Sequence, residues 1–224
     1  MAELTIIAAY DAPGRGPAGL AWDGRFLWNA DYATGSIYQL DPQTMTVQHS
    51  ILCPGNLSGL AWDGRTLWQS LHDAGWIRQV NPATNDFDHT VHLDSEGWIS
   101  GVAWENNHLW AVSQQFGKLL AVNPADSAIL RTLPAPIAAG DLDFHNGYLW
   151  LGLAYPMQFN SIYQGFDWVG DEQHYALLQI DPADGAEIAR YPLNFMPMGV
   201  AWAGDTLWLS HAGGRKLYQM AFSK

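Results

Sequence analysis

Residues 19–28 read GLAWDGRFLW, and close copies of this stretch recur along the 224-residue chain. The copies are GLAWDGRFLW from Gly19, GLAWDGRTLW from Gly59, GVAWENNHLW from Gly101, DLDFHNGYLW from Asp141 and GVAWAGDTLW from Gly199. The first four copies are almost evenly spaced, and the spacing lengthens between the fourth and the fifth. A period of about 40 residues is typical of small structural units that stack on one another. The sequence therefore predicts a repeat fold.

Each copy predicts four short strands. The first ends at the first Trp of the motif, a tight turn follows, and the second strand carries the Leu-Trp pair. The third ends at an Asx-Pro turn such as Asp41-Pro42 or Asp181-Pro182, in which the Asx side chain caps the turn and Pro presets φ. A fourth strand follows, for example over 46–52 or 187–193. Repeated four-stranded units of this length predict the blades of an all-β propeller.

The two ends of the chain complete the fifth unit. After Trp208 the last copy supplies a third strand over 216–222 but no fourth one. Residues 4–10 align with the fourth strands of the other units, and pairing the two ends would remove an open sheet edge. We therefore expect one five-bladed β-propeller over 1–224, with units starting near 19, 59, 101, 141 and 199. A β-sandwich does not explain such strict repetition.

Composition narrows the classes of partner. Nine of the 12 tryptophans fall into two columns of the repeat, as expected for packing between blades. The formal net charge is −12, and the 10 basic residues are scattered, which argues against nucleic acid and anionic membranes. Cys53 is the only cysteine, so no intramolecular disulfide forms. No secretory signal or bilayer-spanning stretch is visible, and we expect a soluble cytoplasmic protein.

The Gly-Leu-Ala-Trp-Asp-Gly motif with its Leu-Trp pair resembles the repeats of the streptogramin lyase (virginiamycin B lyase), SMP-30/gluconolactonase and NHL group of propellers. The five units and the Asp-Pro-Ala-Asp-Gly turn at Asp181 are also similar to the plant-type glutaminyl cyclotransferases. The resemblance implies the architecture and makes hydrolase, lyase and cyclotransferase activities the ones to consider. Catalytic residues do not carry over, because no unit has the His/Glu pair of the lyases or the Phe-Thr-Gln-Gly-Leu-like segment of the cyclotransferases.

Unit four departs from the other copies at its first strand, where Asp141 and Asp143 replace Gly and Ala. The first strand of a blade lies nearest the axis, and residues two apart point the same way. We expect both carboxylates near the wall of the central channel. Two like charges there raise a pKa or call for a divalent cation such as Ca²⁺ or Mg²⁺. The alternative is that they cap a turn or face a water-filled tunnel.

Unit four also carries an insertion, which we place at 155–175 because the spacing to the next copy is longer there. It joins the second and third strands, on the face that propellers commonly use for ligands. We expect a lid over the mouth of the channel, with a plug or a dimer contact as alternatives. Its aromatic residues are Tyr155, Phe159, Tyr163, Phe166, Trp168 and Tyr175.

The ends of the second strands diverge just after the second Trp, and they should converge on the same face. A rim of apolar groups with a few polar anchors is typical of small-molecule sites. His72 and His211 are candidates for a general base. The other histidines include His49, His89, His92, His108 and His145, which we interpret as structural or solvent-facing. The predicted ligand-binding residues are Asp31, Tyr32, Trp98, Gln114, Tyr155, Tyr163, Phe166, Trp168 and Met198.

Three functions follow from these features. The first is binding of a small molecule at the channel mouth, neutral or cationic because Asp31, Asp141 and Asp143 are acidic. The second is a hydrolase, lyase or cyclotransferase on the same face, with Asp141, Asp143, His72 and His211 as catalytic residues. The third is a scaffold that binds peptides on one face of the ring.

Overall fold

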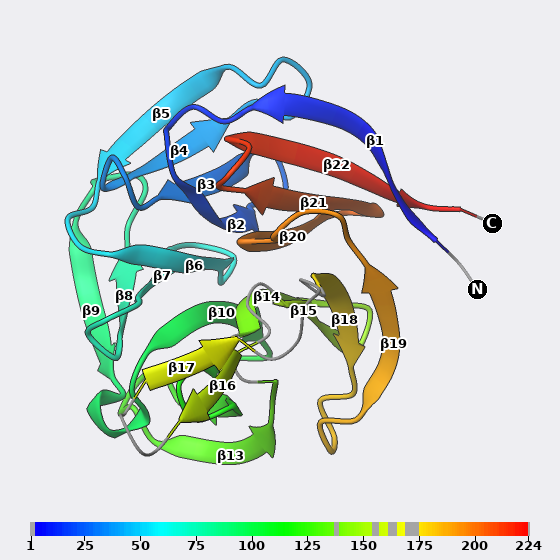
Figure 1. Cartoon of the computed structure of the whole chain (residues 1–224). Coiled ribbons are helices and arrows are strands. Elements are labelled where there is room, and N and C mark those ends of the chain that lie inside the picture. The colour runs from blue at the N-terminus through cyan, green and yellow to red at the C-terminus, as the bar shows by residue number, and fades with distance from the viewer. Residues whose placement is uncertain (1–2, 137–138, 154–156, 161–164, 169–174, 224) are drawn as a thin grey trace.

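The structure is a computed structural model that describes residues 3–136, 139–153, 157–160, 165–168 and 175–223. It forms a ring of five antiparallel four-stranded sheets (Figure 1). Blade one consists of β2 (Pro17–Trp22), β3 (Leu27–Asp31), β4 (Ser36–Leu40) and β5 (Val47–Leu52). Blade two consists of β6 (Leu57–Trp62), β7 (Leu67–Leu71), β8 (Trp76–Val80) and β9 (Phe87–His92). Blade three consists of β10 (Ile99–Glu105), β11 (His108–Ser113), β12 (Lys118–Val122) and β13 (Ile129–Pro134). Blade four consists of β14 (Ala139–His145), β15 (Tyr148–Leu153), β18 (Ala176–Ile180) and β19 (Glu187–Pro192).

The fifth blade joins the two ends of the chain, as predicted. It contains β20 (Gly199–Ala203), β21 (Thr206–His211) and β22 (Lys216–Phe222), and its outer strand is β1 (Leu4–Asp11). β1 and β22 are antiparallel, with Leu4 opposite Phe222 and Asp11 opposite Lys216. Figure 1 shows the two termini side by side at the edge of this blade. The five-bladed fold and its closure are therefore confirmed.

Glycine at the start of four of the five motifs lets the inner strands approach closely. A Cβ added to Gly19, Gly59, Gly101 or Gly199 would lie closer than 3.0 Å to backbone atoms of the next inner strand. Real Cβ atoms do not tolerate such contacts, so these positions need a residue without a side chain. The fourth unit has Asp141 instead, which places a carboxyl side chain among the inner strands.

The second Trp of the motif fills the space between blades, and in four blades its indole N–H donates to the first turn. Trp28, Trp68, Trp110, Trp150 and Trp208 are all buried. In the first three blades, the acidic residue at the first turn accepts the indole N–H. The Nε1–O distances are 2.7 Å for Trp28–Asp23, 2.9 Å for Trp68–Asp63 and 2.7 Å for Trp110–Glu105. The repeat therefore includes an Asp/Glu–Trp bond that the column of tryptophans alone did not predict.

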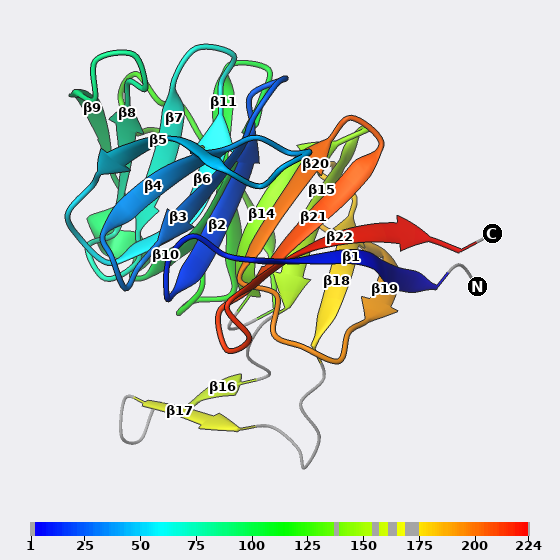
Figure 2. The same ribbon diagram turned by 90° about the horizontal axis from the view of Figure 1, so that it is seen from above.

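The unit-four insertion contains a hairpin where the sequence predicted a loop. β16 (Met157–Asn160) and β17 (Gly165–Trp168) pair antiparallel. Figure 2 shows this hairpin outside the ring, on one side of the blades. In the described part of the chain, helix is limited to one 3₁₀ turn over Asp94–Glu96. No helix among those residues is long and apolar enough to cross a bilayer.

Candidate functional site

The second strands of the blades end on the face of the ring where the first strands begin. Pro17 lies opposite Asp31, Leu57 opposite Leu71, and Ile99 opposite Ser113. The insertion leaves the ring on this face, between β15 and β18. We call it the insertion face, and the opposite one, which carries the Asx-Pro turns, the Asx-Pro face.

His72, Trp98 and Gln114 come together on the insertion face from blade two, blade three and the connection between them. His72 Nε2 lies 2.8 Å from Gln114 Oε1. The His72 ring stacks on Trp98, with centroids 5.4 Å apart and planes inclined by 30°. Gln114 Nε2 donates to the carbonyl of Ala139, at the start of the innermost strand β14, over 3.3 Å. The cluster therefore reaches the innermost strand of blade four.

These contacts determine the tautomer of His72. Because Gln114 Nε2 donates to Ala139, its Oε1 is the atom that faces His72 and must accept a hydrogen bond. His72 Nε2 is then the donor to Gln114, and Nδ1 is an acceptor when the ring carries a single proton. Nδ1 has no hydrogen-bond partner among the described residues. Gln114 is only 7% exposed whereas Trp98 is 37% exposed, so a fixed amide lies beneath an accessible indole.

Backbone hydrogen bonds hold the cluster in place. The amide N–H of Gln114 donates to the Trp98 carbonyl over 2.9 Å, and that of Ile99 donates to the His72 carbonyl over 3.2 Å. His72 N–H donates to Asn56 O over 2.9 Å. The three side chains thus start from a rigid loop framework, as small-molecule sites require.

His211 lies in a separate aromatic group in blade five. Its ring is 5.3 Å from Phe195 and 6.0 Å from Tyr218, and its Nδ1 is 3.5 Å from the Tyr218 hydroxyl. Burial lowers the pKa of His211 and so favours its neutral imidazole. No contact joins it to His72 among the described residues.

Asp31, one of the predicted ligand-binding residues, is used within a turn. It is fully buried, and its Oδ2 accepts from Gly16 N–H over 2.8 Å. Its Oδ1 accepts from the N–H groups of Ala33 and Thr34 over 3.0 and 2.8 Å. Asp31 therefore caps the turn after β3. Its neighbour Tyr32 is 45% exposed on the insertion face.

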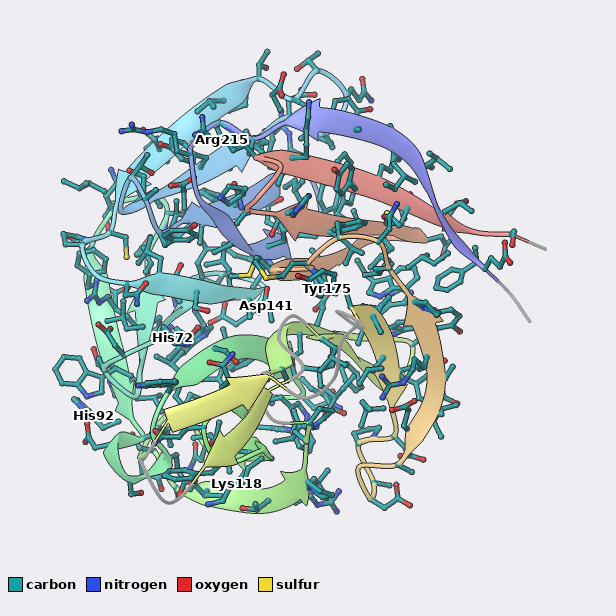
Figure 3. The ribbon with its side chains drawn as sticks, viewed as in Figure 1. His72, His92, Lys118, Asp141, Tyr175 and Arg215 are labelled. Carbon is teal, nitrogen blue, oxygen red and sulfur yellow. The ribbon has the colours of Figure 1, made fainter. Side chains whose placement is uncertain are left out.

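Asp141 lies at the centre of the ring (Figure 3). It is 0% exposed, and its Oδ2 accepts from the N–H groups of Leu20 and Val200 over 3.2 and 3.3 Å. Its Oδ1 accepts from Val102 N–H over 3.4 Å. These donors belong to the innermost strands of blades one, five and three. Burial raises the pKa of Asp141 well above its ordinary value, and the backbone donors act in the opposite direction.

Asp143 points into the ring nearer the Asx-Pro face. Its Oδ2 accepts from Trp202 N–H of the neighbouring blade over 2.7 Å, and its Oδ1 accepts from Phe144 N–H over 2.8 Å. Burial raises the pKa of Asp143 to about 6, against the two hydrogen bonds. Asp143 is four residues along β14 from Ala139, about 13 Å at strand rise. The four candidate catalytic residues are therefore not gathered at one point.

The two carboxylates do not fit a divalent cation. Every contact described for Asp141 and Asp143 comes from a backbone N–H group, which presents hydrogen rather than an oxygen ligand. Ca²⁺ and Mg²⁺ need six or more oxygen ligands. Within the described ranges, no group of three or more His, Cys, Asp or Glu side chains is arranged to hold a metal.

Several predicted ligand-binding residues belong to the insertion. Tyr155 and Tyr163 lie outside the described residues, and Phe166 and Trp168 are placed only by the backbone of β17. Met198 begins the approach to β20 on the insertion face, with its N–H donating to Ser210 O over 2.9 Å.

Sequence reasoning missed two buried amides in the second strands. Asn29 and Gln69 are both 0% exposed, and they donate to the carbonyls of Gly19 and Gly59. Within the described part of the chain, their Oδ1 and Oε1 atoms lack hydrogen-bond partners. The sequence does mark these positions, because the other three copies have apolar residues there: Ala111, Leu151 and Leu209.

Fold and site together define the class: a five-bladed β-propeller with a polar and aromatic cluster on the insertion face. Among solved structures, the chain is similar to the Myxococcus xanthus glutaminyl cyclase, at 16% identity and a TM-score of 0.78 over 99% of this chain and 97% of that one. It is also similar to the Cps50 (Swd1) β-propeller domain of Myceliophteria thermophila, at 9% identity and a TM-score of 0.55 over 95% and 99% of the two chains.

A third similar structure is the Kuenenia stuttgartiensis hydrazine synthase, at 12% identity and a TM-score of 0.55 over 90% of this chain and 57% of that one. No family model matches the chain, and no curated protein matches it. At these identities, the likeness to solved structures shows the fold alone.

Proposed function

We propose that the protein binds a small neutral or cationic molecule on the insertion face, with His72, Trp98 and Gln114 as the central contacts. The observation that carries the proposal is the His72–Gln114 hydrogen bond beside the stacked Trp98 ring. It combines an accessible aromatic surface, a fixed amide and an imidazole nitrogen that accepts a hydrogen bond. This combination suits a ligand with an N–H donor next to a flat or charged group.

Charge supports the choice of ligand class. The chain carries a formal net charge of −12, which favours the approach of cations over anions. The indole face of Trp98 attracts a cation through its quadrupole. Asp31 contributes no direct contact, since its oxygens are used within the turn. In this proposal the aromatic residues of the unit-four insertion cover the bound ligand.

A second candidate function is cyclotransfer on an N-terminal glutamine. It is favoured by the near-complete overlap with a structure named a glutaminyl cyclase. In such a reaction the α-amine nitrogen bonds to the side-chain amide carbon, the bond from that carbon to its amide nitrogen breaks, and ammonia leaves. His72 Nδ1 would take a proton from the attacking amine and return it to the leaving nitrogen.

Calorimetry with three probes tests the binding proposal: tetramethylammonium, glutaminyl-alanine amide and acetamide. We expect saturable binding of at least one probe, weakened about five- to tenfold by His72→Ala or Trp98→Ala, since one lost hydrogen bond or cation–π contact costs about 1–1.5 kcal/mol. Replacing residues 157–172 by a short Gly-Ser linker tests whether the unit-four insertion covers the bound ligand.

His92→Ala is the matched control, because His92 is an exposed histidine on the outer strand of the same blade. Binding that survives His72→Ala and Trp98→Ala unchanged would contradict the proposal, as would no binding of any probe at millimolar concentration. Ammonia release from glutaminyl-alanine amide, measured in parallel and lost in His72→Ala, would support cyclotransfer. Binding without ammonia release would support the binding function and argue against cyclotransfer.

A further inference from the structure

A cavity lies on the other side of the ring, in the crevice between blades three and four near the Asx-Pro face. It has a volume of about 420 Å³, which is within the range of small-molecule sites. Its walls come from the first hairpin and outer strand of blade three and from the Asx-Pro turn of blade four. The residues that matter for its chemistry are Glu105, His108, Trp110, Leu130, Arg131 and Pro182.

Arg131 spans this crevice and keeps part of its guanidinium available. Its Nη1 donates to the carbonyl oxygens of Pro182 and Ala183 over 2.7 and 3.2 Å. These two bonds hold the side chain against blade four. Its Nε and Nη2 have no partner among the described residues. The Nε and Nη2 groups form the fork that matches the two oxygens of a carboxylate.

Glu105, the other charged group beside the cavity, is already engaged. Its Oε2 accepts from Trp110 Nε1 over 2.7 Å and lies 3.4 Å from His108 Nε2. Its Oε1 faces Asn106 Nδ2 at 3.4 Å. The carboxylate is thus used to hold Trp110 and His108. Arg131 is therefore the anchor with free donors, and it selects an anion.

The rest of the wall is apolar. Leu130 is 61% exposed beside the cavity, and Pro182 faces it from blade four. Trp110 lies deeper in the crevice, in the same packing cluster as Phe144. An exposed leucine and a proline next to a fixed indole suit an aromatic or branched aliphatic group.

The corresponding crevices of the ring differ at both key positions. His49 and His89 occupy the place of Arg131 in blades one and two. Their Nε2 atoms lie 2.8 Å from Asn85 Oδ1 and 2.8 Å from Pro124 O on the next blade. An imidazole used in this way has no fork for a carboxylate. Phe144 also stands where the other four copies have Trp, so a smaller ring packs beside Trp110.

We propose that this cavity binds a small apolar carboxylate, with the acid on Arg131 Nε and Nη2 and the apolar group between Leu130 and Pro182. The site is independent of the proposed function, since it lies near the opposite face and takes an anion rather than a neutral or cationic molecule. The outcome of the test for this cavity therefore says nothing about ligand binding at the His72 cluster.

Titration of ¹⁵N-labelled protein with phenylacetate tests the proposal. We expect saturable shifts of the Trp110 indole N–H and the Arg131 Nε–H signals. Arg131→Gln should weaken the affinity at least tenfold, because it removes the fork. Phenylacetamide, which has the same shape without the charge, should bind at least tenfold more weakly than phenylacetate.

Arg190→Gln is the matched control, since Arg190 is paired with Glu187 on the outer strand of blade four. Leu130→Glu keeps Arg131 in place and puts a negative charge at the wall, so it should also abolish binding. If Arg131→Gln does not fold, the effect of Leu130→Glu on phenylacetate binding tests the proposal. Equal binding to the variants and the control, equal binding of phenylacetamide, or no saturable shift at millimolar phenylacetate would overturn the proposal.

Discussion

Asp141 and Asp143 are held inside the ring by hydrogen bonds from backbone N–H groups of its innermost strands. Inner strands that meet at an axis leave N–H groups which no neighbouring strand accepts. Asp141 accepts three such groups from three blades, and Asp143 accepts one from Trp202. The two residues therefore act first as acceptors for the ring. Their desolvation makes the ionised form costly.

The raised pKa of Asp143 predicts a specific pH dependence of stability. Its folded pKa is about 6, against an ordinary value of 3.8. The folded protein therefore holds this proton more tightly than the unfolded chain, and the stabilisation is complete below about pH 4. It is lost as the pH rises to 6, with a size of roughly 3 kcal/mol at about 1.4 kcal/mol per pKa unit.

Asp143→Asn should remove this dependence. Urea unfolding of both proteins between pH 3.5 and 7.5 measures it, and the difference between their unfolding free energies isolates the residue. We expect Asp143→Asn to gain stability relative to the original protein as the pH rises from about 4 to 6. Asp88→Asn, at an exposed carboxylate on β9, should show no such gain. A constant difference across the range would mean that Asp143 does not titrate there.

In the first hairpin of blades one and two, an Asp combines a turn cap with a hydrogen bond to the buried Trp. In blade two, Asp63 Oδ1 accepts from the N–H groups of Arg65 and Thr66 over 2.8 and 2.6 Å. Its Oδ2 accepts from Trp68 Nε1 over 2.9 Å and from the Thr66 hydroxyl over 2.7 Å. One carboxylate thus links the turn to the core between blades. This explains why an acid follows the first Trp in three of the copies.

Asp63→Ala should therefore destabilise the protein by about 2–4 kcal/mol, because it removes the cap and leaves a buried indole N–H without an acceptor. Asp63→Asn should cost less, since its oxygen still accepts from the turn. Asp73→Ala, in the exposed turn after β7, is the control and should change stability by less than about 0.5 kcal/mol. Urea unfolding measures all three. A loss for Asp63→Ala no larger than that of the control would rule out the linking role.

Closure by β1 decides whether the ring behaves as one unit. β1 pairs with β22 along its length, and Tyr10 packs on Trp208 with ring centroids 5.7 Å apart. Asp11 Oδ1 accepts from Lys216 Nζ over 2.7 Å. Without β1, the edge of β22 would expose unpaired backbone groups, which favour association between copies.

Deleting residues 1–12 should lower the Tm by roughly 10 °C or more, at about 2–4 °C per kcal/mol for a chain of this size. The shortened protein should also self-associate through β22. A synthetic peptide of residues 3–12 should restore the monomer and much of the Tm, whereas a scrambled peptide should not. Calorimetry and light scattering measure both effects. A monomeric shortened protein of unchanged Tm would show that closure contributes little.

The repeat alone determined the number of blades, their strand order and the pairing of the two ends, because these depend on strand periodicity and turn chemistry within a single unit. The same logic placed Asp141 on an innermost strand. Only the tertiary structure decided that Asp31 caps a turn, that His72 meets Gln114, and that Arg131 reaches the turn of the next blade. Such contacts depend on side-chain rotamers and on the spacing between blades, which a local pattern does not specify.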